Sequence, residues 1–409
     1  MMEESRKEIS PFRCAPVEMT VNLRLKMTKI LKMVLPAMLL AGLFVFLFFW
    51  NKVEIVPLIQ NNTQQFEKAV VTKILQDNLQ ENGSRIGNQK VMVKFLTGPD
   101  KGKEVKAVST NGSLYGATCK KGMKVITLTN KAGEVEITSV YSFDRTWIVA
   151  GFVLFLFALL ILVGGKNGFK AVLGLAVTFI FIAFFLFPAI YRGINPVLAA
   201  VITVSLSTII TIYILGGYTA KSAGAILGTV SGVIIAGLCA TIFSKIAHIT
   251  GYNVSNIETL IFVSKYTQIQ CGDLLFAGIL ISSLGAVMDV AFSISSAVTE
   301  IHKVDNSLGL KELFKHGMNI GRDMMGTMAN TLILAFTGGT LSELVLDYAY
   351  DIPFLQLINS YAIGIEIIKG IAGSVGIILT VPLVAFFAAF LCGKKDGVKK
   401  QKKSDNEKL

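Results

Sequence analysis

Long runs of uncharged apolar residues recur along this chain, and they limit its fold more than any other feature. A helix needs roughly 18 such residues to cross about 30 Å of hydrocarbon, and lipid admits few alternatives to a helix. Runs near or above this length cover residues 33–50, 147–163, 171–190, 197–215, 222–243, 274–298, 326–346 and 371–392, and only Asp289 and Glu343 interrupt them with a charge. The sequence therefore predicts an all-α polytopic membrane bundle of about eight transmembrane helices.

The composition agrees with a chain that lies largely in a bilayer. Hydrophobic residues make up 53% and charged residues 16%, whereas soluble domains carry about a quarter charged residues. The net charge of +12 comes from lysines and arginines that crowd the ends of the apolar runs and the tail after Gly393. Positive charges placed there oppose translocation, so we interpret them as topology signals and not as a nucleic-acid surface.

The distribution of basic residues also predicts an orientation. Among the short connections, one side of the membrane would hold only Arg192, Lys245, Lys265 and Lys369. We therefore expect a multi-pass cell-membrane protein with both termini in the cytoplasm. Its segments would be a cytoplasmic start at 1–29, an anchor at 30–50, an extracytoplasmic domain at 51–145, seven helices at 146–392 and a basic cytoplasmic tail at 393–409.

The segment 51–145 loses the membrane character and carries β signals. Its polar start, 60–89, has room for one helix, whereas Val91, Val93 and Phe95 then alternate with polar residues. Further short β-rich runs follow, separated by glycine-containing turns. This spacing predicts a small inserted β-rich domain of four or five strands, either a barrel or a sandwich. It is equally compatible with a solvated domain that has no ligand of its own.

Two partly apolar stretches, 256–270 and 352–369, each precede a predicted span. We expect both to be interfacial or re-entrant helices on the outer side. Counting 352–369 as a ninth span would place the lysine-rich tail outside, against the charge bias.

Small residues recur at four-residue spacing through the span at 222–243. Gly224, Gly228 and Gly232 form the centre of this stripe, which begins at Ala220 and ends at Ala240. Helices in lipid gain packing energy where small residues allow the backbones to approach closely. We therefore predict a helix-packing surface, with a sliding surface or a backbone-lined permeation path as the alternative.

Asp289 is the most informative charged residue, because it lies well inside the predicted span at 274–298. A carboxylate at that depth costs about 2.5–3.5 kcal/mol on insertion scales and usually faces a partner, a cavity or a pathway. Antiparallel packing would bring the next span close, so Asp289, Ser293, Asn330 and Thr331 are the candidate intramembrane polar site. The alternatives are a protonated structural aspartate and hydrogen bonds that only hold helices together.

Sequence motifs for other chemistries are missing. The five cysteines and three histidines are dispersed, and the chain has no phosphate-binding loop, no dinucleotide fingerprint and no His-Glu-x-x-His. We therefore expect no enzyme activity, no catalytic residues, no metal and no cofactor.

The sequence predicts an anchor, a small β domain and a seven-span block, in this order. It also contains the segments Asp289–Ser293, 321–331 and Phe336-Thr-Gly-Gly339. In these features the chain resembles the YibE/F family over about residues 30–392. This resemblance implies a multi-span bacterial membrane protein. It supplies no catalytic residues to carry over.

These features predict a secondary transporter or permease for a small solute or ion, which uses Asp289. The alternative is an envelope sensor or assembly scaffold, whose extracytoplasmic domain binds an envelope protein while the spans anchor it in the lipid bilayer. A water-lined cavity that reaches Asp289 would favour the transporter, and an apolar patch on the β domain would favour the scaffold.

Overall fold

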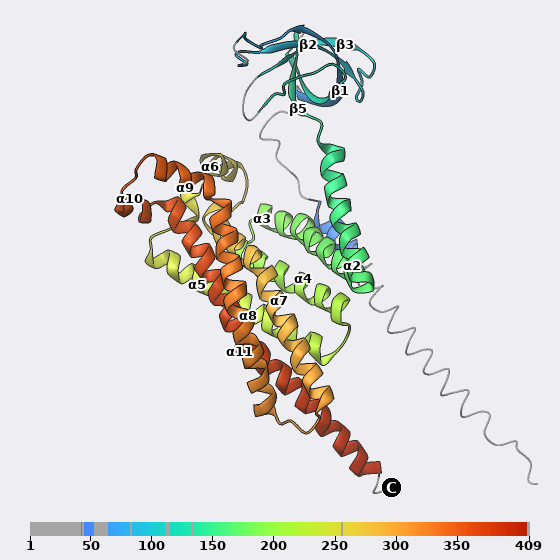
Figure 1. Ribbon diagram of the computed structural model, residues 1–409, viewed down its shortest axis with the longest axis vertical. Helices are drawn as coiled ribbons and strands as arrows, with labels where there is room; N and C mark the ends of the chain where they lie inside the picture. The colour runs from blue at the N-terminus through green and yellow to red at the C-terminus, as the bar shows by residue number, and fades with distance from the viewer. Residues whose placement is uncertain are drawn as a thin grey trace, which may run out of the picture.

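A computed structural model describes residues 42, 45–52, 64–81, 84–110, 115–132, 135–254 and 257–406, with side chains up to Gly393. It consists of a small β-barrel followed by a bundle of long helices (Figure 1). Most of the predicted first span, at 33–50, lies outside these residues, as do the first 29 residues.

The barrel has five strands, β1 Gln64–Gln76, β2 Gln89–Phe95, β3 Glu104–Ser109, β4 Lys124–Ala132 and β5 Val135–Phe143. They close in the order β1-β2-β3-β5-β4, with β3 and β5 parallel and the other neighbours antiparallel. This is the strand order of the OB-fold. The predicted barrel is therefore present, and the sandwich alternative is wrong.

The barrel core is small and mostly β-branched, with Val71, Val91, Val93 and Val125 fully buried. The prediction of a helix within 60–89 was wrong, because β1 occupies most of its first half. In β1 the buried residues Glu67, Ala69 and Val71 alternate with outward-facing ones, which is the period of a strand.

The barrel joins the helical part through two residues. Asp144 accepts a hydrogen bond from the backbone N–H of Thr146 (3.1 Å) and forms an ion pair with Lys68 of β1 (3.2 Å). The Thr146 hydrogen bonds and the Lys68 ammonium together hold the pKa of Asp144 below its ordinary value. Helix α2 Thr146–Phe181 begins at once, so the connection is short and cross-linked.

Helix α2 contains a sharp turn at Gly165, where φ is +52° and ψ is −130°. A methyl group at Gly168 would overlap the carbonyl of Leu160, which lies eight positions earlier, so the two arms of α2 meet beside the turn. The second arm continues through a π-helical turn, η2 Ile182–Leu186, into α3 Phe187–Tyr191 (Figure 1). The two predicted spans at 147–163 and 171–190 thus lie on the two arms.

Four further long helices and one bent pair complete the bundle: α4 Pro196–Gly216, α5 Ala220–Ile246, α7 Leu274–Val304, α8 Leu310–Gly339 with α9 Leu341–Ala349, and α11 Tyr361–Asn406. Within the described residues, five helical segments are long and apolar enough to cross a membrane. The bent pair α8–α9 would make a sixth, and the segment Thr146–Tyr191 counts once although it turns at Gly165. The chain is therefore a helical membrane protein with an inserted barrel.

The two predicted interfacial stretches differ from each other. Helix α6 Ile257–Tyr266 fills most of 256–270 as a separate short helix. The stretch 352–369 does not form one helix: α10 Phe354–Ile358 is a single short turn, and residues from Tyr361 onward already belong to α11. The final helix therefore begins ten residues before the predicted start at 371, because residues 361–370 contain no proline and no glycine pair that would end a helix.

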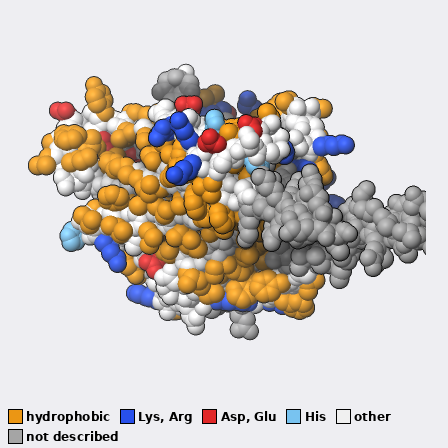
Figure 2. Space-filling view, turned by 90° about the horizontal axis from the view of Figure 1, so that it is seen from below, with side chains coloured by type: hydrophobic (Ala, Val, Ile, Leu, Met, Phe, Trp, Pro, Cys, Tyr) orange, Lys and Arg blue, Asp and Glu red, His pale blue; other side chains and the backbone are white. Residues whose placement is uncertain are grey.

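The helical surface is largely apolar. Figure 2 shows hydrophobic side chains over much of the described part of the face seen from below, with charged side chains scattered among them. The first arm of α2 exposes apolar residues on every side, including Phe152 at 71% and Val163 at 88%. Such a surface suits lipid contact, since soluble proteins rarely expose large continuous apolar areas.

Candidate intramembrane site

One face of α7 is open, although the rest of the helix is tightly packed. Val287, Val290 and Ile294 are fully buried against neighbouring helices. The exposed residues Gly278, Ser282, Gly285 and Asp289 instead form one stripe at steps of three and four. A methyl group at Gly278 or Gly285 would meet nothing within 4 Å. Asp289 therefore projects from a strip of small residues with free space beside it.

The stripe continues toward one end of α7 through the half-buried Ser293 and Ser296 to the exposed Glu300. Asp289 and Glu300 are 11 positions apart, which corresponds to about 16 Å along a helix. Glu300 lines a polar cavity of about 450 Å³ at this end, together with Thr219 of the α4–α5 connection, Lys221 of α5 and His302 of α7. Ser293 and Ser296 thus lie between mid-helix Asp289 and this cavity on the same face of α7.

The packing of α8 fixes its register on α7. Gly317 lies against Val298, and Gly321 lies against Ile294. The residue number therefore rises by four along α8 where it falls by four along α7. This antiparallel register places Asp289 level with Gly326, and Asn330 level with Gly285. Asp289 and Asn330 therefore differ by about one helical turn along the bundle.

The predicted polar pocket is only partly assembled. Asn330 and Thr331 are exposed, as is Asp289, whereas Ser293 is half-buried. No hydrogen bond joins Asp289 to the other three among the described residues, and the Thr331 hydroxyl instead donates to the carbonyl of Thr327 in its own helix (2.8 Å). Helix α8 turns its buried face, which includes Leu332 at 8% exposure, toward the bundle and its polar face away.

The glycine stripe of α5 lies where α5, α7 and α11 meet. A methyl group at Gly224 would stand 3.2 Å from the Cα of Ala388, and one at Gly228 would stand 3.2 Å from the Cα of Val384, both in α11. At Gly232 it would meet Val287 of α7 at 3.0 Å and would also overlap Thr380 of α11. Only glycine permits this backbone separation, so the three glycines occupy a packed junction.

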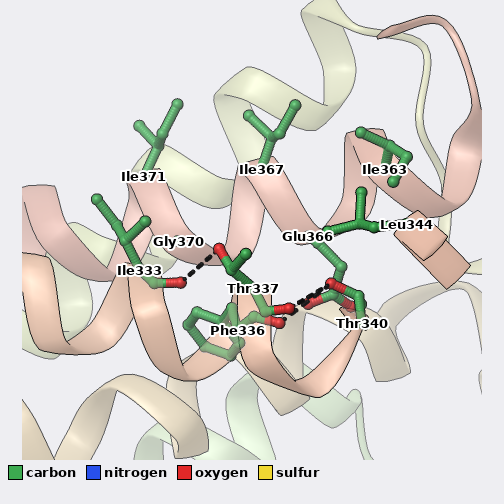
Figure 3. Close-up of a pocket in the computed structure, with 10 residues that line it drawn as sticks. All are labelled: Ile333, Phe336, Thr337, Thr340, Leu344, Ile363, Glu366, Ile367, Gly370 and Ile371. Carbon is green, nitrogen blue, oxygen red and sulfur yellow. Dashed lines mark hydrogen bonds between the residues drawn. The ribbon is translucent and has the colours of Figure 1, made fainter. Parts of the chain in front are cut away.

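Helix α8 breaks at Thr340, where α9 departs at 60°. The elbow and the neighbouring part of α11 enclose a cavity of about 210 Å³ (Figure 3). Four of its ten lining residues are isoleucine, and the hydroxyls of Thr337 and Thr340 point back to carbonyls of α8 in Figure 3. Glu366 is the one charged residue in its lining, and its carboxylate binds Lys369 at 2.6 Å.

Sequence reasoning missed both cavities. The elbow depends on where α8 bends, which no proline marks, and the polar cavity depends on residues from the α4–α5 connection and from the ends of α7 and α11. The spacing of Ser293, Ser296 and Glu300 after Asp289 was the available signal for the polar stripe that leads toward this cavity. No group of three or more potential metal ligands occurs within the described part of the chain.

Comparison with known proteins identifies the helical part. The family model described as YibE/F-like protein matches residues 152–394, which run from the first arm of α2 into α11 and exclude the barrel. No curated protein and no solved structure matches the chain significantly.

Proposed function

This chain belongs to the YibE/F-like family, and from that premise and the geometry of α7 we propose that it is a secondary transporter or permease for a small solute or ion. The observation that carries the proposal is the exposed carboxylate of Asp289. It lies on an open strip of glycine and serine in mid-helix, and no described residue donates a hydrogen bond to it. A carboxylate at membrane depth usually faces a partner, a cavity or a pathway.

The polar stripe below Asp289 gives that carboxylate a route to the membrane edge. A cation or a proton that binds Asp289 passes Ser293 and Ser296, whose hydroxyls replace part of its hydration, and reaches the polar cavity at Glu300. The bend between α8 and α9 supports the same function, since broken helices are frequent in transporters. In this proposal the exposed stripe of α7 lines the pathway.

The orientation that follows from the basic residues completes the proposal. Both termini and the cavity at Glu300 face the cytoplasm, and the barrel lies outside the cell membrane. A labelling experiment tests this orientation: a cysteine introduced at Lys101 should react with a membrane-impermeant maleimide in intact cells, and one introduced at Lys311 should react only after lysis. The reverse pattern would exclude it.

The transport proposal is tested with full-length protein and matched variants. We first expect a thermal-unfolding screen against ions and small metabolites to reveal a ligand, since 100 times the dissociation constant stabilises the folded state by about 2.7 kcal/mol. The rise in unfolding temperature that this ligand causes should vanish in Asp289→Asn. It should persist in Asp323→Asn, which removes an exposed carboxylate from α8 instead.

Proteoliposomes then separate binding from transport. The ligand found in the screen should accumulate in vesicles that contain the wild type or Asp323→Asn, and at least tenfold more slowly with Asp289→Asn. Uptake by Asp289→Asn at the wild-type rate would show that the α7 stripe is not the pathway. A ligand whose stabilising effect survives in Asp289→Asn would place the site elsewhere.

A specific observation on the barrel favours the scaffold alternative as a second candidate. Phe66, Tyr115 and Tyr141 are exposed and contact one another, with ring centroids 5.3 Å apart in both pairs. Exposed aromatic clusters are common at protein interfaces. A photo-reactive residue at Tyr115 should cross-link to one envelope protein in cells if this candidate is correct, whereas the same residue at Lys101 should not.

A further inference from the structure

The outer surface of strands β1 to β3 carries four lysines around one methionine. In the register of the barrel, Lys73 of β1 and Lys106 of β3 both pair with Met92 of β2, from opposite sides. Lys90 and Lys94 lie two positions before and after Met92 on the same strand. All four lysines are exposed, and their strand neighbours Val91 and Val93 point into the core. We call Lys73, Lys90, Lys94 and Lys106 the lysine frame.

The frame extends onto the next strand. Lys124 of β4 pairs with Val70 of β1, which in turn pairs with Lys94, so Lys124 points to the same side. The loop before β4 carries Lys120 and Lys121, both exposed, and it lies beside β1, where Gly122 donates a backbone hydrogen bond to Val71. Two carboxylates lie along this surface: Glu104 is opposite Lys94, and Asp144, which binds Lys68, donates a backbone hydrogen bond to Lys124.

Four barrel carboxylates neutralise different basic residues. Asp100 and Glu136 bind Lys103 and Lys131, with distances from 2.9 to 3.6 Å, away from the frame. Asp144 and Asp77 likewise bind Lys68 and Arg85. No ion pair involves the four frame lysines or Lys120, Lys121 and Lys124 within the described residues. The basic surface is therefore left uncompensated, whereas Lys68, Arg85, Lys103 and Lys131 elsewhere on the barrel are paired.

The spacing of the frame decides what kind of anion fits it. Neighbouring strands are about 4.8 Å apart and alternate residues on one strand about 7 Å apart, so the frame lysines stand roughly 8 to 14 Å from one another. A single phosphate ion can reach only one or two of them. A linear chain with repeated negative groups can contact all of them at once, and each contact releases a counterion.

We propose that the β1–β2–β3 surface of the barrel binds a linear polyanion that carries repeated phosphate groups. The OB-fold strand order does not by itself establish this function, because one fold hosts many functions; the lysines carry it. A flat lipid surface fits less well, since Met92 at the centre of the frame is half-buried and the exposed aromatic cluster at Phe66 lies toward β4 and β5. This proposal is independent of transport.

The test uses full-length protein in nanodiscs of zwitterionic lipid and long-chain inorganic polyphosphate with a fluorescent end label. The frame variant is Lys73→Gln, Lys94→Gln and Lys106→Gln combined. The matched control is Lys101→Gln, Lys103→Gln and Lys131→Gln combined, which removes the same charge from elsewhere on the barrel. Anisotropy gives the affinity as a function of salt, and far-ultraviolet circular dichroism checks the fold of each variant.

We expect the frame variant to bind at least tenfold more weakly at 50 mM salt and to lower the slope of log affinity against log salt by about 2, the value for three lost contacts. The control should stay within twofold of the wild type. Equal losses in the two variants, or wild-type binding by the frame variant, would overturn the proposal. So would tight binding to vesicles that contain phosphatidylglycerol without binding to polyphosphate, which would identify the surface as a lipid-docking site.

Discussion

Replacing Gly228 by alanine should loosen the junction between α5 and α11. The new methyl group would overlap Val384 Cγ2, and it would stand 3.0 Å from Val384 Cβ and 3.2 Å from Val384 Cα. Carbon atoms prefer separations of about 3.5–4.0 Å. A different rotamer of Val384 relieves only the first contact, because the Cα belongs to the backbone of α11. The helices must therefore separate by roughly 0.5 Å.

That separation also affects the neighbouring close approaches at Gly224 and Gly232, so the cost spreads along the interface. Overpacking of this kind typically costs 1–3 kcal/mol, and we expect Gly228→Ala to lower the free energy of unfolding by about 2 kcal/mol. The control is Gly285→Ala on α7, where nothing lies within 4 Å of the new methyl group. Alanine also favours a helix over glycine by up to about 1 kcal/mol, so the control should be neutral or stabilising.

The assay is reversible unfolding in mixed micelles, with the fraction of sodium dodecyl sulfate as the denaturing variable. The far-ultraviolet signal of the helices reports unfolding, and the transition midpoints are compared between the two variants and the wild type. A change below about 0.5 kcal/mol in Gly228→Ala, or an equal loss in Gly285→Ala, would refute the reasoning from close backbone approach.

Three further predictions concern the barrel. Gly98→Ala should destabilise it by about 1–2 kcal/mol or more, because Gly98 has a φ of +84° and a methyl group there would overlap the Glu67 carboxylate; hydrogen exchange of β1 measures this. The pKa of Asp144 is lower in the folded state than in the unfolded chain, where it is about 3.9. Ionised Asp144 therefore contributes its full stability above about pH 3.9, and this contribution is lost as the pH falls through the folded-state pKa. Over this pH range, hydrogen-exchange protection should fall less in Asp144→Asn than in the wild type. Cys119 is 1% exposed and burial raises the pKa of its thiol, so N-ethylmaleimide should modify it at least tenfold more slowly in folded than in denaturant-unfolded protein, as measured by mass spectrometry.

The long helices and the later strands could be predicted because their apolar residues report burial directly. The runs at 197–215, 222–243 and 274–298 each fall within one helix, and Val91, Val93 and Phe95 point into the barrel as their alternation indicates. Strand β1 was harder to recognise, since its core positions include the short Ala69 and the polar Glu67, whereas its outward positions include Phe66 and Val70. Its hydrophobic contrast between the two faces is therefore weak.

The candidate site was only partly predictable for a different physical reason. Asn330 and Thr331, which the sequence assigns to the candidate site, lie on one exposed face of α8 together with Thr327. Spacing does not determine the rotation of that helix against its neighbours. In α8 the rotation is set by Gly317 and Gly321, which pack against α7 and α11 and so turn the polar face outward.

The two-residue connection between the barrel and α2 couples their movements mechanically. Asp144 ties β1 to the first turn of α2 through its contacts with Lys68 and Thr146, so force on the barrel reaches the helix without a slack tether. The first arm of α2 has few packing partners, and its far end turns at Gly165. A sideways force on the barrel would therefore bend this arm about the turn at Gly165, relative to the packed helices of the bundle.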